Sequence, residues 1–179
     1  MHLPRYVIVH SDEDAEFRVE MTALELSHAA VAITGGARGI GRATAKAFIA
    51  EGARVFIGDL DADLAKTVAD ELGCHGVGLD VRSRESFAGF LAGVDGPLDV
   101  LVNNAGIMPA GRFVDELDTV TDSIVDVNLN GVLRGTKLAL PGMLERGSGH
   151  IVNVASYLGM VPAAGLATYC ATKHAVVGF

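Results

Sequence analysis

The amino-acid sequence predicts an α/β protein built on a doubly wound parallel sheet. Short segments rich in Val, Ile and Leu alternate with helix-like segments along the chain, as parallel sheets with crossover helices require. The apolar segments show no alternation of polar and apolar residues, which indicates strands buried on both faces. The expected strands are 29–34, 54–59, 75–80, 98–103 and 150–155, and the expected helices are 40–51, 62–72, 83–94, 119–146 and one that begins near 166.

Before the first strand, residues 1–28 carry six acidic side chains against two basic ones and show no apolar period. We expect an N-terminal arm or extension there, followed by one domain over 29–179. Met21 opens a short run into the first strand, so we hypothesise that it is the biological start. No basic segment followed by a long apolar one opens the chain, and the uncharged stretch 147–172 is interrupted by a proline and several glycines. The sequence therefore predicts neither a signal peptide nor a membrane span.

The first strand runs into a glycine-rich turn with the pattern TGxxxGxG, which starts at Thr34. Glycine permits positive φ and close approach of the backbone to a phosphate, and the helix start that follows offers free N–H groups and partial positive charge. A P-loop would need Lys followed by Ser or Thr, where this chain has Arg42 and Ala43. We therefore expect a dinucleotide site, with a tight structural turn as the alternative. Its candidate residues are Gly35, Ala37, Arg38, Gly39, Ile40 and Gly41.

An acidic residue closes the second expected strand. Asp59 lies about 20 residues beyond the glycines, where a carboxylate can accept both ribose hydroxyls of a dinucleotide and repel a 2′-phosphate. Arg38 argues the other way, because a guanidinium in the turn could hold that phosphate. The residue after Asp59 is Leu60 and not a second base, so we expect NAD rather than NADP. The alternative role of Asp59 is to cap the helix that follows, and the two roles can coexist.

Composition excludes several other classes. The chain has 22 acidic and 14 basic residues and a formal net charge of −8, so nucleic acid is not an expected partner. The six histidines fall at no metal-ligand spacing, and the two cysteines form no CxxC pattern. We therefore expect no metal site and no disulfide framework, and a reducing, cytoplasmic location fits best.

Further motifs follow in a characteristic order. They are Asp80-Val81, Asn103-Asn104-Ala105-Gly106, the run VNLNG at 127–131, Ser156, and Tyr169-x-x-x-Lys173. Together with TGxxxGxG, over about residues 29–179, this order resembles the short-chain dehydrogenase/reductase family in its single-domain branch. The resemblance implies a Rossmann-type sheet that lacks the last strands of the usual seven, because members of that branch run to roughly 250 residues.

Tyr169 and Lys173 carry the chemistry of the motif set. They are four positions apart on one expected helix and therefore lie on one face of it. A phenol ionises only near pH 10, and a neighbouring ammonium stabilises the phenolate, which makes the phenol a usable acid and base. Ser156 follows the fifth strand at the carboxyl edge of the sheet, where its hydroxyl can hold a substrate oxygen. A local turn bond is the alternative for that hydroxyl.

The resemblance also assigns roles. It implies that Tyr169 transfers the hydroxyl proton, that Lys173 also binds the nicotinamide ribose, and that Ser156 orients the carbonyl. Asn128 matches the asparagine that holds a water linking Lys173 to solvent, with a buried structural asparagine as the alternative. The remaining cofactor residues that it implies are Asp80 and Val81 at the adenine, and Asn103, Ala105 and Gly106 beside the cofactor. For Asn103 and Asn104 a structural role is equally open.

Two functional readings follow from these expectations. The first is an oxidoreductase that transfers a hydride between NAD(H) and a secondary alcohol or ketone, with tyrosine as the acid and base. The second is a catalytically incomplete NAD-binding fragment of such an enzyme. The resemblance further implies a small-molecule substrate and homo-oligomers that pair through the long helix and the Tyr-Lys helix.

Overall fold

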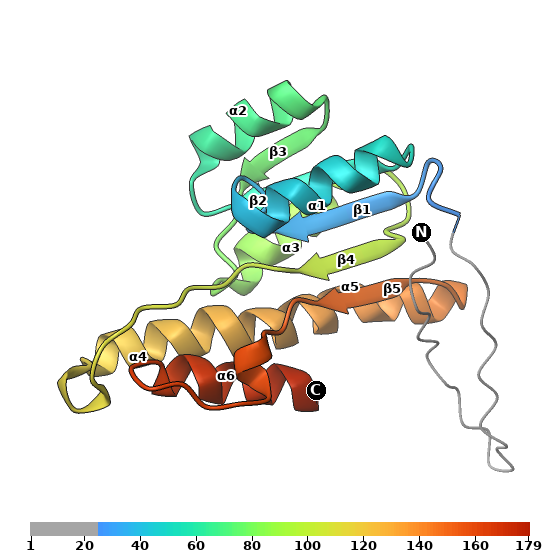
Figure 1. Ribbon diagram of the computed structural model, residues 1–179. Coiled ribbons are helices and arrows are strands. Elements are labelled where there is room, and N and C mark those ends of the chain that lie inside the picture. Colours follow the sequence, from blue (N-terminus) through green and yellow to red (C-terminus); the bar gives the residue numbers. More distant parts are fainter. Residues whose placement is uncertain (1–24) are drawn as a thin grey trace, which may run out of the picture.

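A computed structural model describes residues 25–179, which form a five-stranded parallel sheet with helices packed against it (Figure 1). Every strand runs parallel to its neighbours, and the order across the sheet is β3-β2-β1-β4-β5. The expected doubly wound α/β fold is therefore confirmed. The strands are β1 (Ala30–Thr34), β2 (Arg54–Asp59), β3 (His75–Gly78), β4 (Val100–Asn103) and β5 (His150–Asn153).

The helices follow the expected positions with one exception. The expected helix 119–146 is wrong as a single element, because a five-residue π-helical turn divides it. Such turns shift the register of the side chains that follow and occur often at functional sites. The helices are α1 (Gly39–Ala50), α2 (Ala62–Leu72), α3 (Arg84–Ala92), α4 (Asp118–Val125), α5 (Gly131–Arg146) and α6 (Ala167–Gly178), and the short turns are η1 (Phe113–Asp115), η2 (Asp126–Asn130) and η3 (Tyr157–Gly159).

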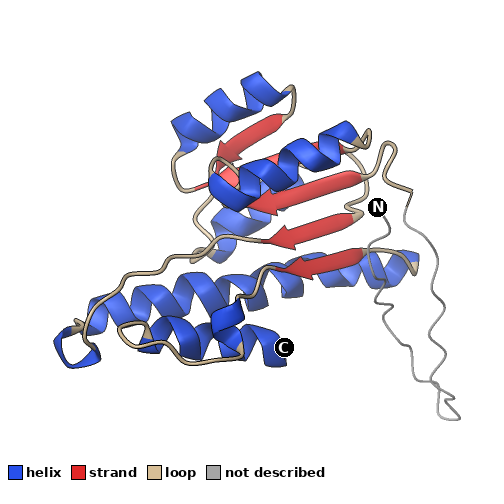
Figure 2. Ribbon diagram, viewed as in Figure 1, coloured by secondary structure: helices blue, strands red, loops and turns tan. Residues whose placement is uncertain are grey.

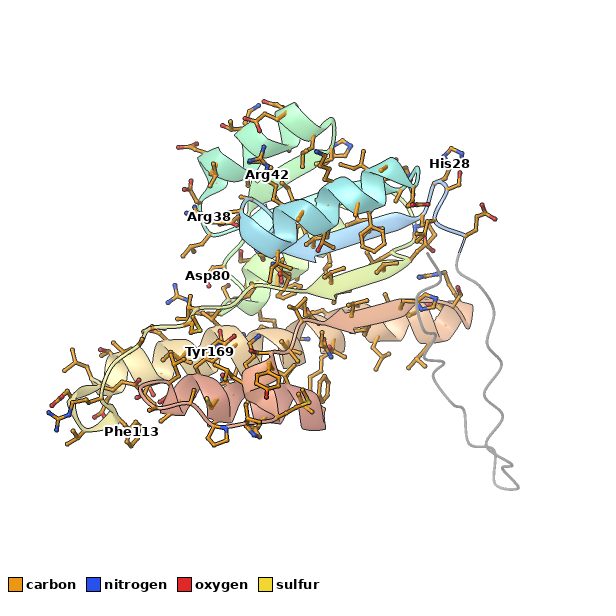
Figure 3. The ribbon with its side chains drawn as sticks, viewed as in Figure 1. His28, Arg38, Arg42, Asp80, Phe113 and Tyr169 are labelled. Carbon is orange, nitrogen blue, oxygen red and sulfur yellow. The ribbon has the colours of Figure 1, made fainter. Side chains whose placement is uncertain are left out.

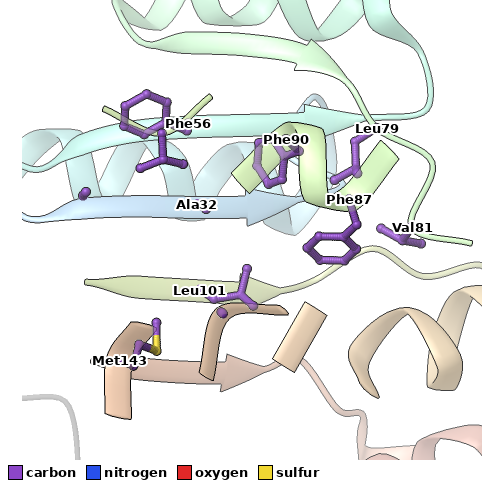
Figure 4. Packing of buried hydrophobic residues seen from close by; sticks show 11 residues of the cluster. Ala32, Phe56, Leu79, Val81, Phe87, Phe90, Leu101 and Met143 are labelled. Carbon is purple, nitrogen blue, oxygen red and sulfur yellow. The ribbon is translucent and has the colours of Figure 1, made fainter. Parts of the chain in front are cut away.

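Two apolar cores cover the two faces of the sheet. In β1, Ala30 and Ala32 face the core that α3 and α5 complete, whereas Val31 and Ile33 face the core that α1 and α2 complete. Both sets are fully buried, because the side chains of a strand alternate between the two faces and both faces are covered. This explains the unbroken apolar runs in the sequence. Figure 4 shows the first core, where Phe87 of α3 lies on the side of Leu101 of β4 and Phe90 of α3 lies near Leu79.

The order of the strands creates a crevice. The chain winds outward from β1 to β2 and β3, then returns to place β4 and β5 on the other side of β1. The connections that leave β1 and β4 therefore lead to helices on opposite faces of the sheet, and a crevice opens between these connections at the carboxyl edge. The segments that follow β1, β2, β3 and β4 all gather there, on the side of the arrowheads in Figure 2.

The contacts of the domain begin before Ala29. Leu26 packs against the core on the α1 and α2 side, and the His28 amide donates to the Gly52 carbonyl. The hypothesis that Met21 is the start, like most of the expected arm 1–28, lies outside the described residues. Within 25–179, no helix is both long and apolar enough to cross a membrane.

Candidate active site

A cleft of about 710 Å³ lies at the carboxyl edge of the sheet. Its walls come from the glycine-rich turn, the segments after β2, β3, β4 and β5, and helix α6. Arg38, Asp80 and Tyr169 lie along this side of the molecule in Figure 3. The sequence-predicted site residues that line the cleft are Gly35, Arg38, Gly39, Ile40, Asp59, Leu60, Asp80, Val81, Ala105, Gly106, Tyr169 and Lys173. Those absent from its lining are Ala37, Gly41, Asn103, Asn128 and Ser156.

The glycine-rich turn is shaped by close backbone contacts. Gly35 has a φ of 63°, and a Cβ there would lie 2.9 Å from the Cα of Ala105. A Cβ on Gly41 would collide with the Gly35 carbonyl oxygen. These glycines therefore let helix α1 start directly beneath the turn. A Cβ on Gly39 would meet nothing within 4 Å, so the space beside the first turn of α1 is open toward the cleft.

A hydrogen-bond network joins this turn to the loop after β4. The Thr34 hydroxyl accepts from the backbone N–H groups of Asn104 and Ala105, each at 3.0 Å. The side-chain amide nitrogen of Asn104 donates to the backbone carbonyls of Thr34 and Gly35 at 2.9 and 3.0 Å. The second asparagine of the NNAG motif is therefore a brace that fixes the floor of the cleft.

Asp59 ends β2 nearly buried at the cleft. One carboxylate oxygen accepts from the Ala37 amide at 3.1 Å, and the other accepts from the Asp61 amide at 3.2 Å. An ionised carboxylate has about four acceptor positions, so Asp59 keeps further acceptor capacity toward the cleft. The alternative role of Asp59 as the cap of helix α2 does not apply. Asp61 is the N-cap, because its side chain accepts from the Leu64 amide.

Arg38 lies at the rim of the cleft. It is the N-cap residue of α1, with an extended backbone and no side-chain capping bond. Its guanidinium donates to the second carboxylate oxygen of Asp61 at 3.0 Å. Beside this pair, the Leu60 side chain is 70% exposed.

Asp80 and Val81 form the wall after β3. The Asp80 carboxylate accepts from the backbone and guanidinium of Arg82, which lowers the pKa of Asp80. The Val81 side chain is buried, and its carbonyl accepts from Arg134 of α5 at 2.6 Å. These contacts hold the loop against α5 so that both residues face the cleft.

Lys173 and Tyr169 form the opposite wall, on α6. Lys173 is only 4% exposed, and its Nζ donates to the Val154 carbonyl at 2.7 Å and lies 5.9 Å from the centre of the Tyr169 ring. Burial lowers the pKa of Lys173, because a charged ammonium loses hydration there. The described chain thus brings the amine and the phenol ring into one cleft with the glycine-rich turn.

Ser156 lies directly after the cleft-lining residues Val154 and Ala155. Its hydroxyl oxygen accepts from the Leu158 amide at 3.1 Å and so caps the short turn η3. This is the local turn bond that the sequence left open as an alternative. The hydroxyl hydrogen stays free to donate, because the oxygen is the acceptor in this bond.

Asn128 lies in the π-helical turn and has no solvent exposure. Its side chain accepts from the Ile107 amide at 2.8 Å and donates to the Ile107 carbonyl at 2.9 Å. It also lies 3.3 Å from the Thr172 hydroxyl of α6. One buried amide therefore ties the loop after β4 to the helix that carries Lys173.

Asn103 lies in the sheet rather than at the cleft. Its amide nitrogen donates to Asn153 of β5 at 2.9 Å, across the register that pairs these residues. Among the described residues its Oδ1 is a buried polar atom without a partner. This geometry corresponds to the structural role that the sequence left open.

Sequence reasoning missed a contact at the start of α6. Glu116 accepts hydrogen bonds from the hydroxyls of Thr121 and Thr168, which lowers the pKa of the Glu116 carboxyl. The N-cap residue of α6, Leu166, has no side-chain capping bond, so this carboxylate supplies negative charge near that helix end. No local motif marks this contact, because Thr168 lies 52 residues beyond Glu116 in the sequence.

Comparison with known proteins identifies the family. Residues 29–179 match the family described as short chain dehydrogenase. The chain belongs to the short-chain dehydrogenase family. The resemblance that the sequence motifs indicated is therefore confirmed.

Several relatives are about two-fifths identical to this chain over the aligned residues. The 2,5-dichloro-2,5-cyclohexadiene-1,4-diol dehydrogenase LinX of Sphingobium indicum is 42% identical over 152 residues, which are 80% of this chain and 61% of that protein. The 2-(S)-hydroxypropyl-CoM dehydrogenase 3 of Xanthobacter autotrophicus is 41% identical over 160 residues, 85% of this chain and 63% of that protein. This short-chain dehydrogenase thus spans about three fifths of the length of these curated relatives.

A solved structure shares the fold. A crystal structure of an actinorhodin polyketide ketoreductase variant with NADPH matches with a TM-score of 0.81 and 40% identity. The match covers 84% of this chain and 62% of that one.

Proposed function

We propose that this short-chain dehydrogenase transfers a hydride between NAD(H) and a secondary alcohol or ketone. The observation that carries the proposal is the cleft that holds Tyr169 and the buried Lys173 opposite the glycine-rich turn. Both walls of the cleft are needed to bind a dinucleotide in this proposal. The glycine-rich turn would hold the phosphates, and the wall with Tyr169 and Lys173 would face the nicotinamide.

The residues of the cleft fit a dinucleotide. The start of α1 has no acidic residue in its first turn and faces the open space beside Gly39, which suits a pyrophosphate. Asp59 has acceptor capacity left for ribose hydroxyls, and Asp80 and Val81 lie farther along the same cleft for the adenine. Lys173 would donate to the nicotinamide ribose. When bound, the nicotinamide accepts or supplies the hydride.

The proton chemistry belongs to Tyr169 in this proposal. In alcohol oxidation its phenolate oxygen takes the hydroxyl proton as the substrate C–H bond breaks, and in ketone reduction the phenol returns that proton to the new alkoxide. Lys173 supports the phenolate through its positive charge. The Ser156 hydroxyl donates to the substrate oxygen and holds the carbonyl near the phenol.

The cofactor preference rests on Asp59. A nearly buried carboxylate that lines the cleft favours ribose hydroxyls and disfavours a 2′-phosphate, so we propose NAD over NADP. The ketoreductase structure was solved with NADPH, and its identity of 40% leaves room for a different preference in this chain.

Substitution of Tyr169 by Phe tests the proposal. Because the phenol oxygen alone is removed, Tyr169→Phe should abolish turnover of a panel of secondary alcohols with NAD, while NADH still binds in a fluorescence titration. Tyr157→Phe is the matched control, since Tyr157 is 71% exposed and absent from the lining of the cleft. Turnover retained in Tyr169→Phe would remove the proposed acid and base.

A second candidate function is dinucleotide binding without turnover. The same experiment separates the two. NADH binding without turnover by the unmodified 179-residue chain supports the second function, and turnover that depends on Tyr169 supports the first.

A further inference from the structure

The rim of the cleft holds a second acidic residue that does not line the cleft itself. Asp61 contacts the guanidinium of Arg38 at 3.0 Å, whereas Arg38, Asp59 and Leu60 line the cleft. Arg38 is the basic residue of the glycine-rich turn that could hold a 2′-phosphate. Its orientation therefore bears on the choice between the two nicotinamide cofactors.

We propose that Asp61 is a cofactor-selectivity residue that acts by positioning Arg38. Asp61 holds the Arg38 guanidinium on the α2 side of the rim and balances the charge of Arg38, so that Arg38 does not bind a 2′-phosphate. The inference rests on the proposed function, because it concerns how the dinucleotide site discriminates.

The geometry around Asp61 makes it a fixed partner rather than a loose surface carboxylate. One oxygen accepts from the Leu64 amide at 3.1 Å and caps α2, which leaves the other oxygen directed to Arg38. The Asp61 amide donates to Asp59, so the backbone is held as well. The pair is exposed, with 64% of the Arg38 side chain and 50% of the Asp61 side chain accessible, so its effect is modest and depends on salt.

Asp59 and Asp61 have different tasks in this arrangement. Asp59 is nearly buried, accepts two backbone amides and presents its remaining acceptor capacity to the cleft. Asp61 contributes no wall of the cleft and reaches the dinucleotide only through Arg38. Removal of the Asp61 charge therefore frees a cation at the rim and leaves the Asp59 acceptor in place.

The test measures the dissociation constants of NADH and NADPH by fluorescence titration of the full chain. Asp61→Asn keeps a side chain that caps helices well but loses the charge. We expect the ratio of NADPH to NADH dissociation constants to fall about three- to fivefold, the size of an exposed ion pair, and this change to shrink at high salt. Asp61→Ser, another good cap, serves as a second variant should Asp61→Asn fold poorly.

Two comparisons isolate the positioning role. Glu71→Gln is the matched control, because it breaks the Arg42–Glu71 pair between the same two helices, at 2.7 Å and away from the cleft lining. It should leave the ratio unchanged. In an Arg38→Ala background, Asp61→Asn should have no effect on the ratio, because there is no guanidinium to release.

The outcomes are distinct. The inference would be overturned if the ratio of NADPH to NADH dissociation constants stayed unchanged in both Asp61 variants, or if it still changed in the Arg38→Ala background. NADH binding by these variants would at the same time support the proposed dinucleotide site. A shift in Glu71→Gln as large as that in Asp61→Asn would overturn the inference too. Failure of the unmodified chain to bind either dinucleotide would overturn the proposed function, and this inference with it.

Discussion

Lys173 combines a buried position with a charged group. Among residues 25–179 its ammonium has one hydrogen-bond acceptor, the Val154 carbonyl, and burial lowers its pKa. Such a group costs free energy in the folded state, because the ammonium gives up hydration that it keeps in the unfolded chain. The proposed function accounts for this cost, because it requires a cation beside the phenol of Tyr169 and functional residues are often maintained against stability.

We therefore expect Lys173→Met to stabilise the fold at pH 7 and to weaken NADH binding. The melting temperature should rise by about 2–4 °C, the response to roughly 1 kcal/mol in a chain of this size. The folded-state pKa of Lys173 lies below its ordinary value of 10.5, so the unfolded chain binds the extra proton between these two values. The penalty is thus fully present below the lowered pKa and disappears as the pH rises toward 10.5.

Thermal melts of both proteins from pH 7 to pH 10 check this expectation. The advantage of Lys173→Met should be largest at pH 7 and shrink as the pH rises. A variant that melts below the unmodified protein at pH 7 would show that the hydrogen bond to Val154 outweighs the cost of burial.

Residue-scale reasoning from the sequence succeeded where a motif is local and failed where a contact is distant. The positions of Tyr169 and Lys173 on one helix followed from their spacing, and both line the cleft. The sequence offered Asp59 as an alternative cap of α2, although Asp61 fills that position, because the end of a strand and the start of a helix are uncertain by a residue or two in a sequence.

At the scale of elements, the sequence pattern predicted the five strands and most helices. The strands were recognisable because segments buried on both faces are unbroken runs rich in Val, Ile and Leu. The strands expected at 75–80 and 150–155 end two residues earlier in the structure, and the strand expected at 98–103 begins two residues later. The π-helical turn η2 left no signal, because it shares the apolar pattern of the helices around it. Its buried Asn128 is satisfied by Ile107, a partner that only the tertiary fold supplies.

The start of α1 offers a test at this scale. Gly41→Ala should strongly destabilise the protein, because a Cβ there collides with the backbone at Gly35 and cannot be relieved by a side-chain rotation. Gly89→Ala is the matched control, since it lies in α3 with nothing within 4 Å of its Cβ, and it should stabilise by about 0.5–1 kcal/mol. Urea unfolding of both variants gives the comparison, and equal effects would contradict the proposed role of the turn.

At the scale of the whole molecule, β5 forms one edge of the described sheet and pairs only with β4. The side chain of Val152 in this strand is 40% exposed. Open edges of this kind promote association between chains. The opposite edge, β3, also has an exposed side chain, Val77.

We predict association of the 179-residue chain that increases with concentration and proceeds through the β5 edge. Val152→Lys should reduce the associated fraction in sedimentation velocity, because a charge on an edge strand opposes pairing. Val77→Lys on β3 is the matched control and should leave association unchanged. The reverse pattern would assign the contact to the β3 edge instead.

The two walls of the cleft come from opposite ends of the described chain. Arg38 and Gly39 are made early, whereas Tyr169 and Lys173 belong to the final helix. A nascent polypeptide therefore carries the wall formed by the glycine-rich turn long before the wall formed by α6 emerges from the ribosome. Under the proposed function, a nascent chain would bind a dinucleotide tightly only after synthesis has passed Lys173.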